Sequence, residues 1–388
     1  MIIGLEASSL HGWKSGVGYY TENLLSSVMR LSPEHNYILF SNRDMRAGWR
    51  PLGREVLHDR GYFPVRSVWM QTVLPGTLRR AKPEICHFTN YLAPLALNCP
   101  YVVTIHDMTL YITPRLHNFK KIVLDRSLIP HVARRADAII TVSNSARDDI
   151  VRYLRVPRKK IKVISNAVSP AFTPVTDQVR LEAVRRKYGI EVPYILYVGT
   201  IEPRKNITRL IQAFSQLKGQ GLPHKLVIVG QPGWHCAPIY AEVERLGLQR
   251  EVIFTGYVPF EDLPALYSGA ESMAFPSVYE GFGLPVAEAM ACGTPVVTSN
   301  SSALAEVAGD NALLVNPLQV SDIAGALHRL HRDPHLRREL SRRGLSRATE
   351  FTWDRLARST LDLYEEVVSY RAHVAGEVRK DSRVVREM

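Results

Sequence analysis

Two glutamates, Glu280 and Glu288, enclose a short segment whose residue types suit the binding of a sugar. Each carboxylate can accept hydrogen bonds from a pair of vicinal hydroxyls. Gly281 and Gly283 permit close backbone approach and unusual φ values, and Pro285 suits the first turn of a helix. The amides at that helix N-terminus can hold hydroxyls or a phosphate. The structural alternative is that Glu280 caps the helix and Glu288 supports its dipole.

A second segment, from Gly199 to Asn206, follows a predicted strand and opens a predicted helix. Arg204 and Lys205 stand where the dipole of that helix already favours an anion. A diphosphate is the natural ligand, because arginine binds it with a fork and lysine as a point charge. We also predict that Asn206 caps the helix. The alternative is a solvated basic turn.

A glycine-rich turn from Gly12 to Gly18 lies between the first predicted strand and the first predicted helix. Glycines in a first βα turn let backbone N–H groups approach a phosphate. The turn is not a full dinucleotide fingerprint, because Thr21 stands at the third glycine position. The alternative is a tight turn without a ligand.

Two further segments also follow predicted strands. His106 is a candidate contact for a sugar hydroxyl or an acceptor, or else a buried histidine with satisfied hydrogen bonds, and Asp107 is a candidate cap for the next turn. The backbone around Val258, in Gly256-Tyr257-Val258, is a candidate contact for a base edge or an ordinary turn.

The elements that position these residues alternate between strand and helix in both halves of the chain, which predicts two parallel sheets covered by helices. Ligands of such sheets bind at the carboxyl ends of the strands, here in a cleft between the two domains. A turn-rich stretch at 167–192 is the expected connection, and a helix over Trp353–Tyr370 is expected to return to the first domain. The predicted strands are Ile2–Glu6, Tyr37–Phe40, Glu84–Phe88, Tyr101–Ile105, Ala138–Val142, Ile161–Ile164, Tyr194–Val198, Lys225–Val229, Val252–Thr255, Ser272–Phe275, Pro295–Thr298 and Ala312–Val315.

Composition agrees with a globular protein of two domains. The 388 residues exceed the ~250–300 at which single cores stop growing. No apolar run is long enough to span a membrane, and Met1 leads directly into a strand, so we expect no signal peptide. The cysteines are too scattered in sequence to predict a zinc site or a redox pair. They are Cys86, Cys99, Cys236 and Cys292.

The formal net charge of +12 does not by itself indicate a nucleic-acid partner, because acidic residues interrupt most of the basic segments. The exception is the stretch Arg115–Arg135, where six basic residues face a single acidic one, Asp125, and apolar residues interleave. Such a helix could lie on an anionic membrane surface, and the alternative is a solvated helix face.

Together these segments resemble the retaining glycosyltransferases of family 4, also called glycosyltransferase group 1. The resemblance covers nearly the whole chain and is most specific at Glu280–Glu288. It implies the α/β GT-B architecture of two doubly wound Rossmann-like domains facing across a cleft. The acceptor-binding domain would span 1–170 and the nucleotide-sugar-binding domain 190–350, with the helix 354–375 crossing back.

The resemblance also implies a role for each site residue. Glu280, His106, Arg204 and Lys205 would be the catalytic group, with Glu280 and His106 beside the donor sugar. Gly16 and Gly18 would lie at the donor diphosphate together with the two basic residues. Many relatives carry arginine where this chain has Thr200, so more of the phosphate contact would rest on Arg204 and Lys205. The remaining donor-binding residues would be Val258 at the base, Glu288 at the ribose, and Gly281, Phe282, Gly283 and Leu284 around the sugar.

The expected reaction is transfer of a hexose with retained configuration, without metal or cofactor. The segments at 199–206 and 106–108 resemble bacterial mannosyltransferases of polysaccharide assembly, so the expected donor is GDP-mannose and the acceptor a glycan or lipid-linked sugar. UDP- or dTDP-sugars stay as alternative donors, and a sugar-nucleotide 2-epimerase stays as an alternative function. A phosphorylase is disfavoured, because the sequence has no convincing motif for a pyridoxal-binding lysine. A non-catalytic binding subunit is disfavoured, because Glu280, Arg204 and Lys205 are all present. We expect a cytoplasmic protein, with peripheral contact at the inner face of the plasma membrane as an open alternative.

Overall fold

The computed structural model describes residues 1–11, 16–43, 57–60, 63–114, 119–191 and 193–384. The chain divides into two compact units. The first consists of Met1–Asn166 and Trp353–Met388, and the second of Ala167–Thr352. Each unit is an α/β layer structure with its own parallel sheet.

The first unit contains a seven-stranded sheet within the described residues, in the order β3-β2-β1-β4-β5-β6-β7. All neighbouring strands are parallel. The central strands are buried along their length, as expected for short apolar runs covered by helices on both faces. The strands are β1 (Ile2–Glu6), β2 (Asn36–Ser41), β3 (Leu57–Arg60), β4 (Ile85–Phe88), β5 (Tyr101–Thr104), β6 (Ala138–Thr141) and β7 (Ile161–Val163).

Helices flank this sheet, and several described elements of the unit have no counterpart in the sequence prediction, among them β3, α2, α3 and the short helix α4. The short helices α2 and α3 follow one another directly. Their buried side chains pack in the hydrophobic core and are Trp69, Met70, Leu74 and Leu78. The helices are α1 (Gly16–Leu31), α2 (Arg66–Thr72), α3 (Leu74–Ala81), α4 (Thr109–Ile112), α5 (Phe119–Arg135), α6 (Asn144–Leu154) and α15 (Trp353–Val384), with 3-10 turns at Ser8–Leu10 and Arg158–Lys160.

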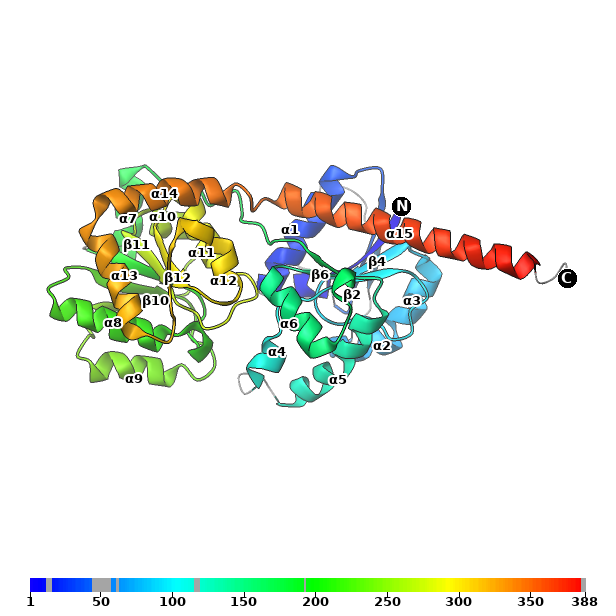
Figure 1. The fold of residues 1–388 in the computed structure, drawn as a ribbon, viewed down its shortest axis with the longest axis horizontal. Helices are drawn as coiled ribbons and strands as arrows, with labels where there is room; N and C mark the ends of the chain where they lie inside the picture. Colours follow the sequence, from blue (N-terminus) through cyan, green and yellow to red (C-terminus); the bar gives the residue numbers. More distant parts are fainter. Residues whose placement is uncertain (12–15, 44–56, 61–62, 115–118, 192, 385–388) are drawn as a thin grey trace. The chain divides into compact units, whose positions relative to one another are not determined.

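The last helix, α15, belongs to the first unit and lies beside α1 (Figure 1). Tyr364 anchors it, because its hydroxyl oxygen lies 2.5 Å from Nδ1 of the buried His87. Nε2 of His87 lies 2.7 Å from the Thr104 hydroxyl. Burial lowers the pKa of His87 to about 3, so this histidine is a neutral link between the sheet and the helix. The helix continues to Val384, beyond its predicted end.

The second unit contains a six-stranded parallel sheet within the described residues, in the order β10-β9-β8-β11-β12-β13. Its strands are β8 (Tyr194–Val198), β9 (Lys225–Val229), β10 (Val252–Gly256), β11 (Ser272–Phe275), β12 (Val296–Ser299) and β13 (Leu313–Val315). Its helices are α7 (Gln178–Lys187), α8 (Ile207–Gly219), α9 (Ala237–Arg245), α10 (Leu263–Ser268), α11 (Leu284–Ala291), α12 (Ser302–Ala308), α13 (Val320–Arg332) and α14 (Pro334–Ala348), with 3-10 turns at Pro203–Lys205 and Gly309–Asn311.

The strand order reverses between β8 and β11, which lie side by side in the centre of the second sheet. One connection leaves β8 towards β9, and the other leaves β11 towards β12. Such a reversal leaves a crevice at the carboxyl ends of the two strands, the usual ligand position in open α/β sheets. The two segments singled out in the sequence, at 199–206 and 280–288, follow these two strands.

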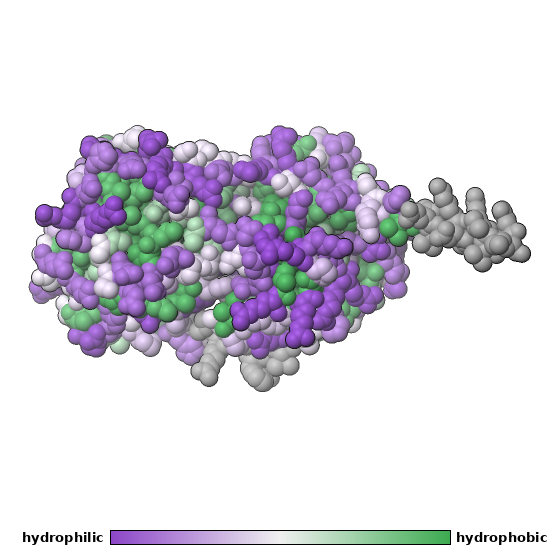
Figure 2. Space-filling view, in the orientation of Figure 1, coloured by the Kyte–Doolittle hydropathy of each residue, from purple (hydrophilic) through white to green (hydrophobic). Residues whose placement is uncertain are grey.

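None of the described helices is long and apolar enough to cross a membrane. Hydrophilic side chains cover most of the face in Figure 2, and apolar ones gather in small separate patches. Two of the scattered cysteines meet in the fold: Sγ of Cys86 and Sγ of Cys99 lie 3.3 Å apart as free thiols. The spacing of the cysteines in the sequence does not predict this pair, because Cys99, which precedes β5, and Cys86, which lies on β4, become neighbours only when the two strands align.

Candidate functional site

Charged side chains from the loops after β8 and β11 form one ion-pair cluster. Nζ of Lys205 lies 2.6 Å from Oε1 of Glu280, and Nη1 of Arg204 lies 2.8 Å from Oε2. Glu202 accepts a second hydrogen bond from Arg204 at 2.7 Å. The structure therefore brings together three of the four residues predicted to be catalytic.

The Glu280 carboxylate is buried yet ionised. Burial by itself would raise the pKa of Glu280, but Lys205 and Arg204 outweigh it and lower that pKa to about 2. The cluster of two cations with Glu280 and Glu202 is formally neutral, so the cations are compensated in the absence of a ligand. A buried ion pair contributes little net stability, because the desolvation of its charges offsets their mutual attraction.

Side chains that the sequence analysis did not single out hold Glu280 in place. Ser277 donates a hydrogen bond to Oε1 of Glu280 at 2.7 Å, and the Ser302 hydroxyl accepts one from the Glu280 backbone N–H at 3.3 Å. The backbone oxygen of Tyr279 accepts a hydrogen bond from Arg204. Ser277 lies on the same loop, three residues before Glu280. This short separation is the feature of the sequence from which the contact with Glu280 could have been predicted.

The prediction that the Asn206 side chain caps α8 is wrong. Asn206 stands at the residue before α8, but its side chain makes no capping hydrogen bond. The side-chain amide instead donates to the backbone oxygens of Pro276 at 2.9 Å and Pro317 at 2.6 Å. Its φ of +61° lies in the left-handed region, which asparagine tolerates better than most residues. Asn206 thus ties the Arg204–Lys205 turn to the loop after β11.

Replacing Asn206 with alanine is expected to lower the free energy of unfolding by about 2–5 kcal/mol. Two buried hydrogen bonds are worth about 0.5–1.5 kcal/mol each, and the left-handed backbone costs alanine about 1–2 kcal/mol. Denaturant unfolding measures the loss. Asn206→Gly also loses the hydrogen bonds, but glycine adopts the left-handed backbone without strain. Asn206→Gly should therefore be more stable than Asn206→Ala by about 1 kcal/mol. Equal stability of Asn206→Ala and the wild type would contradict this role.

The N-terminus of α11 begins directly after Gly283. The φ of Gly283 is +106°, and a Cβ there would lie 2.5 Å from Cδ2 of Leu304, so glycine is needed at this residue. Leu284 starts the helix with Pro285 behind it, as predicted. Gly281 and Phe282 are buried, and Phe282 packs edge-on against Phe351. The first-turn amides of α11 thus follow the Glu280 loop at the same sheet edge.

Glu288 lies on α11 and is only partly exposed. Its Oε2 accepts a hydrogen bond from the Tyr267 hydroxyl at 2.9 Å. Burial raises the pKa of Glu288 to about 7, against the smaller opposite effect of that hydrogen bond. The two glutamates of the motif therefore differ: Glu280 is ionised throughout the neutral range, whereas Glu288 exchanges its proton near neutrality.

This raised pKa predicts a pH dependence of stability. Folded Glu288 binds its proton more tightly than the unfolded chain, so its contribution favours folding at low pH and is lost as pH rises from about 4.5 to about 7. Glu288→Gln should remove this dependence and be more stable than the wild type at pH 8, by an amount on the order of 1–3 kcal/mol. Thermal unfolding from pH 5 to 8 measures it.

Tyr267→Phe provides the control for this pH effect. The hydrogen bond from Tyr267 lowers the pKa of Glu288, so its removal should move the transition to higher pH rather than abolish it. If the Tm of the wild type and the Tm of Glu288→Gln changed in parallel from pH 5 to 8, the Glu288 carboxyl would not titrate within this pH range.

Glycines mark the ends of the neighbouring strands. A Cβ at Gly230, after β9, would lie 2.0 Å from the backbone oxygen of Gly199, after β8, so the two loops touch backbone to backbone. The N–H of Gly230 donates to the oxygen of Gly256 at 3.0 Å. Val258 follows with a buried side chain. The contact of its backbone with a base stays a prediction.

The remaining predicted residues lie in the first unit. His106 follows β5, and its Nε2 lies 2.9 Å from the Thr89 oxygen. Burial lowers the pKa of His106 despite that hydrogen bond. Asp107 accepts hydrogen bonds from the N–H and hydroxyl of Thr109, at 2.9 and 2.6 Å, which is the capping role considered in the sequence.

The glycine-rich turn is described only from Gly16 onwards, because residues 12–15 lie outside the described ranges. Gly16 is the exposed first residue of α1, and Gly18 is buried. A Cβ at Gly16 would meet no described atom within 4 Å, so packing within the described part does not require glycine there. The convergence of Gly16 and His106 with the Glu280 cluster stays a prediction.

Known proteins resemble both units. Residues 182–347 match the family described as glycosyl transferases group 1, and residues 15–172 match glycosyltransferase family 4. The O-antigen chain mannosyltransferase B of Escherichia coli is 34% identical over 78% of this chain and 77% of that protein. The serotype-specific mannosyltransferase WbdA of Escherichia coli is 36% identical over 59% of this chain but only 28% of its own length.

Among solved structures, Anabaena HepE in complex with UDP and glucose has a TM-score of 0.74, covers 94% of this chain and 99% of its own, and is 18% identical. This likeness shows the shared fold of two doubly wound domains.

Proposed function

Because the chain belongs to the group 1 (family 4) glycosyltransferases, with the GT-B fold, we propose that it transfers mannose from GDP-mannose to a glycan or lipid-linked acceptor in polysaccharide assembly. The observation that carries the proposal is the cluster of Glu280, Arg204 and Lys205 at the reversal of the strand order. It combines a carboxylate for a sugar with two cations for a diphosphate at one sheet edge.

The proposed chemistry breaks the bond between the anomeric carbon and the donor phosphate and forms one to the acceptor oxygen. Positive charge develops on the sugar and negative charge on the departing diphosphate. Arg204 and Lys205 stabilise the diphosphate, and the Glu280 carboxylate stabilises and positions the sugar. The acceptor proton passes to an oxygen of the leaving phosphate on the same face, so the anomeric configuration is retained. These steps need neither a metal nor a cofactor.

The other predicted residues complete the proposed donor site. Glu288 binds the ribose hydroxyls in its ionised form. Because its pKa is about 7, the affinity for the donor should increase as the pH rises through neutrality. The backbone of Val258 meets the base, and the first-turn amides after Gly283 meet the sugar or phosphate. Gly16 and His106, in the first unit, are the remaining residues that we propose as donor contacts.

Mannose is proposed because the relatives above are described as mannosyltransferases. A thermal-shift screen across GDP-, UDP- and dTDP-sugars tests the donor, since a ligand of the folded state raises Tm. GDP-mannose should give the largest shift, and a larger shift with a UDP- or dTDP-sugar would overturn the choice of donor. Transfer should persist in excess chelator, and product should require an acceptor. An epimer formed without acceptor would indicate the 2-epimerase instead.

We also propose peripheral contact with the inner face of the plasma membrane through the basic stretch 115–135. In the described part of α5, Arg134 and Arg135 are exposed at its end. Residues 115–118, and the side chains of 119–124, lie outside what the structure describes. Flotation should recover the protein with liposomes that contain anionic lipid and not with neutral ones. Failure to float in both would end this proposal without affecting the donor site.

A further inference from the structure

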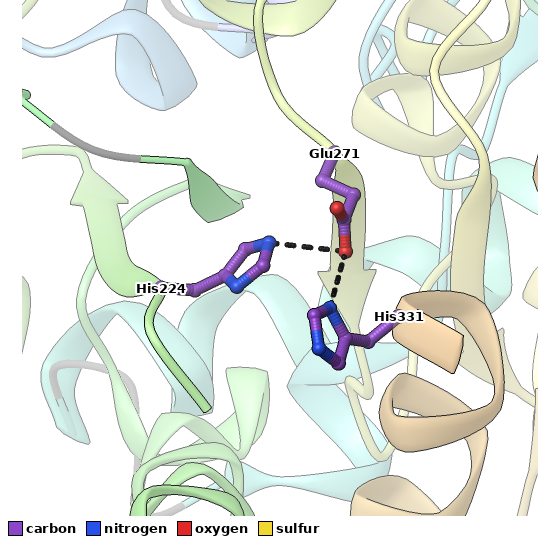
Figure 3. Close-up of side chains that lie close together, drawn as sticks. All are labelled: His224, Glu271 and His331. Carbon is purple, nitrogen blue, oxygen red and sulfur yellow. Dashed lines mark hydrogen bonds and ion pairs between the residues drawn. The ribbon is translucent and has the colours of Figure 1, made fainter. Parts of the chain in front are cut away.

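A second cluster of ionisable side chains lies at the other edge of the second sheet. His224 directly precedes β9, Glu271 directly precedes β11, and His331 is in the last turn of α13. Figure 3 shows both imidazole rings turned towards one carboxylate oxygen of Glu271. Three segments far apart in the sequence thus present two nitrogens and one oxygen to a common point.

The distances suit a small metal ion. Nε2 of His224 lies 3.0 Å from Oε1 of Glu271, and Nδ1 of His331 lies 3.3 Å from the same oxygen. All three ligand atoms lie within 4.8 Å of one another. Tetrahedral ligands at about 2.0–2.1 Å from Zn²⁺ are about 3.3 Å apart, so only a modest approach of the two rings is needed.

His224 provides an independent indication of a ligand. Its side chain is buried, with 2% of its area exposed, yet neither ring nitrogen has a hydrogen-bond partner. Nε2 is close enough to Glu271 for such a bond but is not oriented for one. A buried polar group without a hydrogen bond is costly, and histidine is the commonest metal ligand. A metal at the common point would satisfy a nitrogen of this ring.

The surroundings of Glu271 also fit. Arg337 lies 3.8 Å from Oε2, the oxygen turned away from the two histidines. His331 is the most exposed of the three, which leaves water access to a fourth position.

We propose that His224, Glu271 and His331 bind one divalent transition-metal ion of the Zn²⁺ type, which fastens α13 to the amino-terminal edge of the second sheet. The site is separate from the donor site, because Glu271 precedes β11 and Glu280 follows it. The four residues of that strand span about 13 Å. The metal therefore stabilises the fold and takes no part in transfer.

The test uses the full chain, stripped with a chelator and titrated with ZnCl₂ against a chromophoric chelator. We expect one Zn²⁺ per chain and, at a hundredfold excess over Kd, a rise in Tm of roughly 5 °C or more. His331→Ala should lose both effects and, because His331 is partly exposed, should still fold. His328→Ala is the matched control, since His328 is exposed one turn earlier on α13. It should keep both effects.

Cobalt distinguishes this site from the thiol pair Cys86–Cys99. Co²⁺ bound at the proposed site should give the visible bands of a four-coordinate ion without a thiolate charge-transfer band. Zinc-independent Tm, or equal binding by His331→Ala and the wild type, would overturn the proposal and identify the cluster as a plain ion pair. Transfer activity should be the same with and without the metal, so failure here leaves the proposed function untouched.

Discussion

Glu280→Gln is expected to lower kcat for glycosyl transfer about 10²–10³-fold. Preorganised charge at the reacting centre is worth about that much in other enzymes, and glutamine keeps the size of the side chain but not its charge. The loss should appear in kcat more than in KM, because the sugar becomes positively charged only in the transition state. Steady-state transfer from the donor sugar measures it, corrected for the folded fraction.

The same variant should bind the free nucleoside diphosphate more tightly than the wild type does. Glu280 holds Lys205 at 2.6 Å and Arg204 at 2.8 Å, so in the wild type a diphosphate competes with a carboxylate for both cations. Its removal leaves these cations partly uncompensated, which should also lower the stability of the unliganded protein by about 3–5 kcal/mol. Calorimetric titration with GDP and denaturant unfolding measure the two effects.

Glu202→Gln is the matched control. Glu202 also pairs with Arg204, at 2.7 Å, but makes no ion pair with Lys205. Its replacement should reduce kcat less than about tenfold, as for a charge one step removed from the sugar. Full activity of Glu280→Gln would exclude Glu280 from the reaction. An equal loss in both variants would show that kcat depends on the charge balance of the cluster and not on Glu280 itself.

Lys205→Met is expected to reduce kcat/KM about 10³-fold and to weaken binding of the nucleoside diphosphate about 10–100-fold. A charge-assisted contact to phosphate is worth about 1.5–3 kcal/mol in binding, and more when charge builds up on the leaving group. The direction of the binding change is opposite to that for Glu280→Gln. The two variants together therefore separate the residue that binds the leaving group from the residue that acts on the sugar.

Lys218→Met is the control for a lost lysine in the same unit. Lys218 pairs with Glu251 at 2.8 Å and lies on α8, away from the Glu280 cluster. It should leave both kcat/KM and GDP binding unchanged. Lys205→Arg keeps the charge and should recover part of the loss. If Lys205→Met bound GDP as tightly as the wild type, the diphosphate would not contact Lys205.

Much of the fold, and the residue types of the candidate site, could be predicted from the amino-acid sequence. Short apolar runs alternating with amphipathic stretches predicted the strands to within a residue or two, because side-chain periodicity is a local property. The glycines and Pro285 around Glu280 predicted a helix start at Leu284, which is where α11 begins. Elements with weak local patterns were missed, among them β3, α2 and α3.

The order of the strands and the partner of each charge depend on contacts between segments that are distant in the sequence, so neither could be predicted. That Glu280 pairs with Lys205 follows from β8 and β11 lying side by side, which no local pattern encodes. In the folded protein, the Asn206 side chain binds the backbone oxygens of Pro276 and Pro317 instead of capping α8. Burial in the same fold raises the pKa of Glu288 to about 7. Solvent exposure and distant neighbours set both properties, and neither exists until the chain has folded.

The cluster of His224, Glu271 and His331 illustrates the limit most clearly. Its members are separated by 47 and 60 residues, which matches no ligand spacing known from sequence. They meet because two parallel strands begin at the same sheet edge and α13 ends there. Residue types determined what chemistry was available to this protein, and the alignment of its strands determined which of those residues could act together.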